Sequence, residues 1–220
     1  MNKTSILIDL DIFIRKTKKC NFTPKELAEY IHKYSFKHIS SLKAEIYRIF
    51  IYDAPPIDKK MHNPITNKPI DFSKSEMALF RKELHSEIKK LPATALRLGK
   101  IDANSIKWNF KDYKKFKKFI RGEIKHDELN ENDFILELRQ KQVDMKIGID
   151  IIWLSLKKLV DKIVLISGDS DFVPASKIAR REGIMIILDP LRNNINDDLS
   201  EHIDYLRTFN IKCDNASKSI

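Results

Sequence analysis

Short apolar runs that end at an acidic residue recur along the chain, and they predict strands. The run from Ile163 to Ile166 is followed by Ser-Gly-Asp-Ser-Asp, and the run that begins at Ser5 ends at Asp9. A continuous apolar run bounded by turn residues is typical of a strand that is buried on both faces of a parallel sheet. We expect further strands at residues 44–52, 93–100 and 184–188.

Helices are predicted between these strands. The sequence Thr23-Pro24-x-Glu26 begins one of them, because Thr can cap the helix and Glu can reach back to the cap. Ser73 and Glu76 repeat this spacing at the start of a second helix. Further helices are expected at residues 108–120 and from the Asp-Ser-Asp turn to residue 181. Residues 143–160 are apolar nearly all round and predict a buried helix.

Strands that alternate with helices predict an α/β fold, with a Rossmann-like, mostly parallel sheet flanked by helices. The length of 220 residues suits a single domain over residues 1–220. A segment rich in Pro and Asn between Asp53 and Asp71 is longer than most connections. We interpret about 53–140 as an insertion of helices and loops in the middle of that domain.

The predicted helix at 108–120 is both aromatic and basic. One side at helical spacing carries Phe110, Tyr113, Phe116, Phe119 and Ile120, and lysines cover most of the remainder. This spacing predicts an aromatic stripe that faces the core and a solvated lysine face. Two binding roles stay open, because the rings could stack on bases and the lysines could contact phosphates.

The charge of the chain favours a polyanionic partner. Lys and Arg number 41 and Asp and Glu number 31, which gives a net charge of +10. Such an excess favours nucleic acid before a membrane surface. An apolar fraction of 42% is enough for a core, yet no apolar stretch reaches membrane length and no signal-like segment precedes the first strand.

The cysteines give little sign of metal binding. Cys20 and Cys213 stand far apart, and the chain has no CxxC motif and no cluster of Cys and His. This pattern argues against structural zinc and fits a reducing compartment, so a cytoplasmic protein is expected.

Acidic residues follow the predicted strands at positions that would meet. Asp9 and Asp169 come after different strands, so they project from the same edge of a parallel sheet. Asp171 follows in the turn, and Asp144 joins them if the start of its helix points at this edge. Asp11 occupies the next position on the same side as Asp9 if the extended backbone continues. A structural role stays open for the turn, in which an acid only caps the following helix.

Clustered carboxylates repel one another unless a positive charge lies among them. A hard divalent cation such as Mg²⁺ or Mn²⁺, which prefers oxygen ligands, meets that need. An acidic metal pocket in a basic protein points to a phosphodiester substrate. By contrast, Asp150 lies about 240° round its helix from Asp144 at ~100° per residue, so we expect a structural role for it.

Three segments resemble a known family. They are Ile6-Leu-Ile-Asp-Leu-Asp11, Lys141-Gln-Val-Asp-Met-Lys-Ile-Gly-Ile-Asp150 and Val164-Leu-Ile-Ser-Gly-Asp-Ser-Asp-Phe172. In this order they are similar to the motifs of the NYN domain family, the LabA-like branch of the PIN-like nuclease superfamily. The resemblance implies a PIN-like fold and a metal-dependent endoribonuclease. It favours RNA over DNA as the substrate, and single-stranded RNA over double-stranded RNA.

The resemblance also implies roles for individual residues. The acids expected to bind Mg²⁺ or Mn²⁺ and to carry catalysis are Asp9, Asp144, Asp169 and Asp171. Ser167 would shape the pocket, and Ser170 is a further candidate beside the metal. The chain departs from the family pattern Ile-Asp-Gly-x-Asn, because Leu10 and Ile12 replace the Gly and the Asn. Asp11 is the candidate to supply the polar group that the Asn would have given.

Basic residues near these acids are candidates for nucleic-acid binding. They are Arg15, Lys141, Lys146, Arg180 and Arg181. Lys141 would lie about 60° round the helix from Asp144, at ~100° per residue, if the helix extends back that far. The alternative for each is a solvated side chain, since most lysines are exposed.

Two other functions stay open from the sequence. The pattern Asp9-x-Asp11 also occurs in haloacid-dehalogenase-like phosphatases, in which Asp9 would be the nucleophile and Asp11 the general acid. A non-catalytic module for nucleic-acid binding or assembly fits the positive charge equally well, because fold does not determine function. The sequence leaves a homo-oligomer open.

Overall fold

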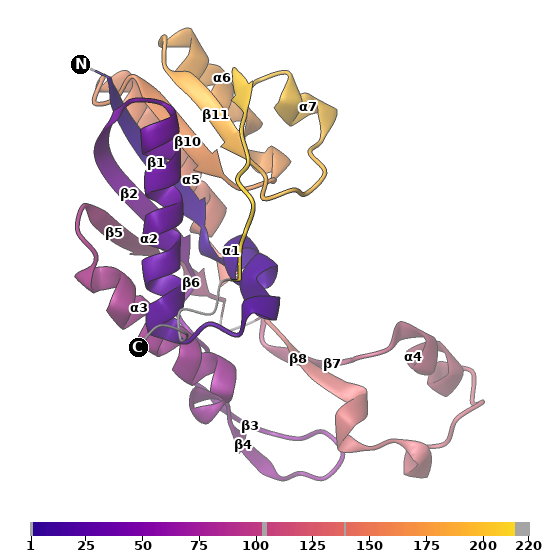
Figure 1. The fold of residues 1–220 in the computed structure, drawn as a ribbon. Helices are drawn as coiled ribbons and strands as arrows, with labels where there is room; N and C mark the ends of the chain where they lie inside the picture. Colours follow the sequence, from indigo (N-terminus) through magenta and orange to yellow (C-terminus); the bar gives the residue numbers. More distant parts are fainter. Residues whose placement is uncertain (1, 103–104, 139, 214–220) are drawn as a thin grey trace.

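A parallel sheet forms the centre of the computed structural model, which describes residues 2–102, 105–138 and 140–213. Its six strands lie in the order β5, β2, β1, β10, β11, β12 (Figure 1). They are β1 Lys3–Asp9, β2 Glu45–Asp53, β5 Thr94–Leu98, β10 Lys162–Ile166, β11 Met185–Asp189 and β12 Tyr205–Leu206. Every neighbouring pair is parallel, which confirms the predicted α/β fold. The short strand β12 was not predicted.

The strand order contains one switch point. The chain starts in the middle with β1, proceeds through β2 to the edge strand β5, and then returns to add β10 on the other side of β1. Ile8 and Ile166 are paired near the carboxyl ends of β1 and β10. In open α/β sheets, ligands bind beyond the carboxyl ends of the two strands at which the order reverses.

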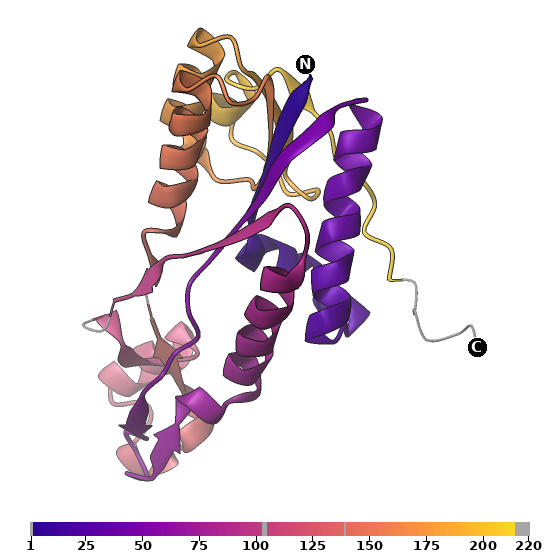
Figure 2. The same ribbon diagram turned by 90° about the vertical axis from the view of Figure 1, so that its left-hand side faces the viewer.

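Helices cover both faces of the sheet (Figure 2). The long ones are α2 Pro24–Ser41 and α3 Glu76–Lys90 on one face, and α5 Val143–Leu156 and α6 Val173–Arg181 on the other. Alternate residues of β1 point to opposite faces. Ile6 and Ile8 therefore pack with α2 and α3, and Leu7 packs with α5 and α6. The shorter helices are α1 Leu10–Thr17, α4 Tyr113–Ile120, α7 Asp197–Ser200, η1 Lys18–Cys20, η2 Phe72–Lys74, η4 His126–Glu128, η5 Glu131–Asp133 and η6 Ser170–Phe172.

The helix starts follow local capping chemistry. Thr23 and Glu26 form the predicted capping box at α2. For α3 the predicted cap was wrong by two residues, because Ser73 lies inside η2 and Ser75 accepts the hydrogen bond from the amide of Ala78. Asp71 accepts a hydrogen bond from the amide of Ser73 and caps η2, so α3 begins after this short helix.

The apolar helix expected at 143–160 is α5, which ends at Leu156. It is not buried all round. Its sheet-facing side is buried at Ile147, Ile151 and Leu154, whereas Met145 and Trp153 on the outer side are more than half exposed. The helix forms the outer layer of the fold, so only one of its sides meets the sheet.

The middle of the chain contains two additions to the main fold. One is a hairpin of β3 Lys60–His62 and β4 Pro69–Asp71. The other, which we call the β7–β8 lobe, comprises residues 105–138 and contains α4 between the antiparallel strands β7 Lys107–Phe110 and β8 Phe134–Glu137. The predicted insertion at 53–140 also encloses α3 and β5, which belong to the main sheet and its helix layer.

The predicted helix at 108–120 was wrong in its first part. Trp108 and Phe110 alternate with exposed neighbours in the strand β7, and Asp112 then caps α4. The rings of Phe116 and Phe119 do form an apolar side, but they pack on Phe110 within the lobe, at 5.3 and 5.8 Å between ring centroids. They do not reach either core of the main sheet.

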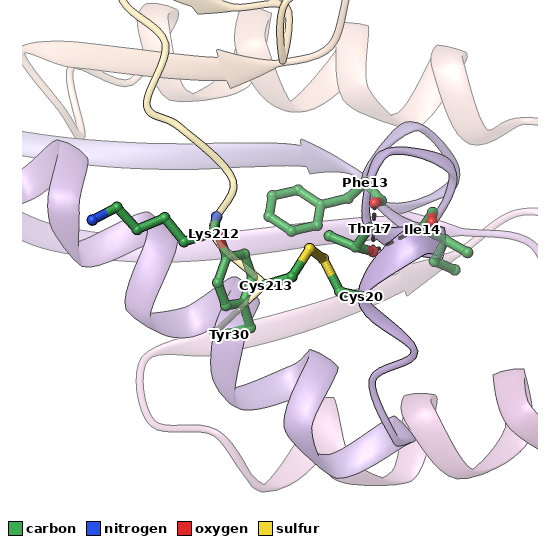
Figure 3. Close-up of a disulfide and its surroundings, with 7 residues drawn as sticks. All are labelled: Phe13, Ile14, Thr17, Cys20, Tyr30, Lys212 and Cys213. Atoms are coloured by element: carbon green, nitrogen blue, oxygen red, sulfur yellow. Dashed lines mark hydrogen bonds between the residues drawn. A yellow bond between two sulfur atoms is a disulfide. The ribbon is translucent and has the colours of Figure 1, made fainter. Parts of the chain in front are cut away.

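The two cysteines form a disulfide that was not expected (Figure 3). It joins Cys20, at the end of η1, to Cys213, which follows β12, and the amide of Lys212 donates to the hydroxyl of Tyr30 beside it. The cysteine count therefore no longer supports a reducing compartment. Among the helices of the described residues, none is both long and apolar enough to span a membrane.

Candidate active site

The chain turns from strand to helix at Asp9. This residue ends β1 and is the N-cap of α1, and its Oδ1 accepts a hydrogen bond from the amide of Asp11 at 3.1 Å. Asp11 therefore lies in the first turn of a helix. The condition for placing both acids on one side, a continued extended backbone, is not met.

Asp169 repeats this arrangement after β10. It is the N-cap of η6, and its Oδ1 accepts from the amide of Asp171 at 3.0 Å. The structural role considered for this turn is thus present. It uses one carboxylate oxygen of Asp169 and leaves the other oxygen and the whole carboxylate of Asp171 for another partner.

Asp144 enters from the opposite direction, in the first turn of α5. The segment that begins this helix packs closely against Gly99, which follows β5. A Cβ atom at Gly99 would lie 2.6 Å from the carbonyl oxygen of Lys141 and 2.7 Å from Cγ2 of Val143. Only glycine allows this approach, which places the start of α5 at the carboxyl edge of the sheet.

Three of the four predicted acids come together. Asp144, Asp169 and Asp171 each offer a carboxylate oxygen within 4.8 Å of the other two. Burial raises the pKa of Asp144, and the charges of Asp169 and Asp171 raise it further. This acidic cluster has the oxygen-only donor set that suits a hard divalent cation, and mutual repulsion favours such a cation.

Asp9 lies beside the cluster, but it does not belong to that set of three. Burial raises its pKa to about 6, and the charges of Asp11 and Asp144 contribute. Its carboxylate is therefore close enough to interact with that of Asp144 across the switch point between β1 and β10.

A pocket of about 400 Å³ opens next to Asp9 and Asp169. Its other lining residues are Ile12, Arg15, Ser167, Gly168, Ser170, Asn193, Asn194 and Asn196. The three asparagines were missed from the sequence. They belong to the loop after β11, and its position at the carboxyl end of a parallel strand was the signal that could have found them. Ile12 replaces the family's Asn with an apolar side chain on the pocket wall.

Asp11 has partners of its own. Arg81 of α3 donates to Asp11 and to Asp53, and Arg15 lies 3.3 Å from Asp11 through its Nε. His85 lies 2.7 Å from the buried Asp53, which ends β2. Asp11 therefore does not replace the missing Asn in the pocket, and it links α1 to α3 instead.

The predicted basic residues lie in different places. Arg15 lines the pocket. Lys141 is in β9 Gln140–Lys141, which pairs with β6 Lys100–Ile101, so the helix does not extend back to it. Its Nζ lies 2.6 Å from Asp102. Lys146 donates to the carbonyl oxygen of Leu98 at 2.6 Å.

Arg180 and Arg181 lie at the other edge of the sheet. The helix α6 begins beside Asp171 but runs back along the sheet, so its end lies next to Met185, the first residue of β11. Arg180 is bonded there to Asp204 at 3.1 Å. The expectation that these two arginines surround the acidic cluster was wrong.

Asp150 has the expected structural environment. It is buried and accepts from the hydroxyl of Tyr52 at 2.6 Å, and Nε of Arg97 lies 2.8 Å away. Burial, together with the charge of Asp150, raises the pKa of Tyr52 well above its usual value. The carboxylate thus fastens α5 to β2 away from the acidic cluster.

A model of the NYN domain family matches residues 3–208. The chain belongs to the NYN domain family. Membership agrees with the three motifs and the parallel sheet, and it gives no support to the haloacid-dehalogenase-like alternative. It implies a PIN-like nuclease family, to which the cluster of three aspartates is suited.

Other comparisons add little. A crystal structure of a Vibrio parahaemolyticus protein of unknown function, VPA0982, is similar with a TM-score of 0.49 and 15% sequence identity. The likeness covers 95% of this chain and 93% of that one. It is too weak to support an argument about function. No curated protein matches the sequence significantly.

Proposed function

We propose that this NYN protein is a metal-dependent endoribonuclease that cleaves single-stranded RNA at the acidic cluster. The observation that carries the proposal is the approach of Asp144, Asp169 and Asp171 to within 4.8 Å at the switch point of the sheet. Nuclease family membership and a net charge of +10 support it. We also propose that the catalytic unit is the single domain formed by the main sheet.

The cluster fits Mg²⁺ or Mn²⁺, because it offers carboxylate oxygens and no sulfur or nitrogen ligand. A cation held by Asp144, Asp169 and Asp171 would supply Lewis acidity toward the oxygens of the phosphodiester. The side chain of Asp9 would complete the site from β1, where burial raises its pKa to about 6 and the charges of Asp11 and Asp144 contribute.

The pocket beside the cluster supplies groups that can orient a nucleotide. Asn193, Asn194 and Asn196 offer both donors and acceptors, which suit base edges and the ribose 2′-hydroxyl. Arg15 is well exposed, and its ion pair with Asp11 is open to exchange for a phosphate. Ser167 and Ser170 also line the pocket, where Ser170 would contact the sugar-phosphate backbone and the buried Ser167 would shape the turn.

The test is cleavage of a fluorescent single-stranded RNA in Mn²⁺, in Mg²⁺ and in EDTA. Cleavage should require a divalent ion and be abolished by Asp169→Asn, which keeps a side-chain oxygen for the cap. A matched control is Glu29→Gln on the exposed side of α2, which should cleave like the parent protein. If the parent binds RNA but never cleaves it under these conditions, the protein is a non-catalytic binding module.

A further inference from the structure

The β7–β8 lobe contains a concentrated stretch of positive charge. Residues 107–125 include eight Lys or Arg and two acids, a net charge of +6. The following residues 126–138 are acidic, but several of these acids already have partners inside the molecule. Asp133 pairs with Lys115 at 2.6 Å, and Glu131 pairs with Lys68 of the β3–β4 hairpin at 3.4 Å.

Four positive charges of α4 and its C-cap lie on one side of the helix, whereas Lys115 lies outside this group and pairs with Asp133. At ~100° per residue, Lys114, Lys117, Lys118 and Arg121 span about 100° of the helix circumference. Tyr113 borders them, with its side chain 66% exposed, and Nζ of Lys117 lies 4.8 Å from the centre of its ring. We call these five residues the basic face of α4.

The basic face has few internal partners. Within the described residues, no carboxylate lies within ion-pair distance of Lys114, Lys117 or Lys118. Arg121 has one contact, at 3.7 Å with Glu123, between side chains that are both largely exposed. Such a pair contributes little to stability. The basic face therefore holds several positive charges close together with little ion pairing inside the molecule, and an external polyanion would neutralise them.

The packing of α4 argues for nucleic acid rather than a membrane. A helix that lies in a membrane surface needs a free apolar side to bury. Most of the apolar side of α4 is already occupied, because Phe116 and Phe119 pack on Phe110, whose ring also contacts Phe134 at 4.7 Å, and Ile120 is the exposed exception. What faces solvent is a row of cations beside a tyrosine ring, the combination that contacts phosphates and stacks on unpaired bases.

The lobe also extends from the end of the molecule that holds the acidic cluster. Its two ends join the main fold through the paired strands β6 and β9, and β9 ends at Lys141, three residues before Asp144. Figure 1 shows the lobe projecting beyond the end of the sheet at which β1 leads into α1. An RNA strand whose scissile bond lies at the acidic cluster can thus continue along the lobe.

We propose that the basic face of α4 is a second nucleic-acid contact, which binds the backbone of a single strand while Tyr113 stacks on a base. The enzyme would then favour long strands that reach from the acidic cluster to the lobe over short ones. The identity of the substrate in this inference rests on the proposed function.

The test compares RNA binding in EDTA, where cleavage is prevented. Replacing three lysines together, Lys114→Gln, Lys117→Gln and Lys118→Gln, should weaken binding of a long single strand about tenfold. It should also reduce the log–log salt slope by about 2, since each lost contact removes ~0.7. Tyr113→Ala should weaken binding about fivefold, and Tyr113→Phe should retain it, because the ring and its stacking remain.

The matched control removes three exposed lysines from another helix, with Lys25→Gln, Lys33→Gln and Lys37→Gln on α2. It should bind like the parent. The lobe variant should still cleave a dinucleotide in Mn²⁺ at the parental rate. If the parent cleaves nothing, the proposed function fails while the binding comparison stands.

Equal affinity and equal salt slope for the lobe variant and the parent would overturn the inference. Equal losses in the lobe and control variants would also overturn it, because net charge alone would then explain binding. A further arm uses vesicles that contain anionic lipid. Vesicle binding that depends on these lysines, with RNA binding unchanged, would assign the face to a membrane surface instead.

Discussion

Asp9 accepts a hydrogen bond from the amide of Asp11, yet the two carboxylates serve different parts of the molecule. The first lies beside the acidic cluster, and the second is bonded to Arg81, which also bonds the fully buried carboxylate of Asp53. One turn of backbone thus separates an acid available for chemistry from an acid that anchors α1 to α3.

Arg81→Met should destabilise the fold by about 3 kcal/mol, because among the described residues it leaves the buried charge of Asp53 with only His85 as a partner. Urea unfolding at neutral pH measures the effect. The matched control is Arg15→Met, which removes the exposed partner of the same Asp11 and should change stability by less than about 1 kcal/mol. Equal effects of the two substitutions would show that the buried ion pair is not important for stability.

The metal-free protein should lose stability as the pH rises through 6. The pKa of Asp9 is raised from 3.8 to about 6 in the folded state, so folding favours the protonated form. This contribution is complete below pH 4 and is lost above pH 6. Asp9→Asn, which can still cap α1, should therefore be more stable than the parent at pH 7.5 by about 2 kcal/mol, with little difference at pH 4.

Denaturant unfolding in EDTA at several pH values measures this difference. Saturating Mg²⁺ provides the control, because binding stabilises the parent and should reduce or reverse the advantage of the variant. Parallel pH profiles of the two proteins in EDTA would contradict the account of Asp9.

The sequence was sufficient for the elements whose signals are local. The apolar run at Ile163 and the capping box at Thr23 each depend on a few neighbouring residues, and both are confirmed in the structure. The place of Asp169 and Asp171 was also predictable, because parallel strands bring their carboxyl ends to one edge of the sheet. Asp144 could be added only on the condition that the start of its helix pointed at this edge.

What could not be predicted depends on distant or ambiguous signals. The bonds of Arg81 to Asp11 and Asp53 join positions 70 and 28 residues apart, and no spacing reveals them. Phe110 alternates with Trp108 at the strand period of two, although it also borders the helical stripe, and packing in the lobe decides for the strand. The error at Arg180 came from assuming that a helix stays at the edge of the sheet at which it begins.

Gly99→Ala tests whether the close contact of Gly99 with the start of α5 positions Asp144. The added methyl group would meet backbone and side-chain atoms at 2.6 and 2.7 Å, so the start of α5 must shift. We expect a loss of about 1–3 kcal/mol in stability and a loss of metal-dependent cleavage larger than the loss of folded protein.

Gly148→Ala within α5 is the control, because the nearest neighbour of the added methyl group is Ala175 Cβ at 3.9 Å. It should stabilise α5 by about 0.5–1 kcal/mol. If both variants cleave at the parental rate, the contact at Gly99 does not position Asp144.

The disulfide should contribute strongly to stability, because it closes a loop over a sequence separation of 193 residues. Such a link restricts the unfolded chain, and its loss typically costs about 2–5 kcal/mol. It also holds the segment before Cys213 against α2, where the hydroxyl of Tyr34 donates to the carbonyl oxygen of Phe209 at 3.2 Å.

Reduction of the parent, or replacement by Cys20→Ser with Cys213→Ser, should therefore lower the unfolding midpoint by similar amounts. Reductant should leave the double variant unchanged, which controls for other effects of the reagent. Two thiols that react freely in the oxidised, folded parent would show that the bond does not form in solution.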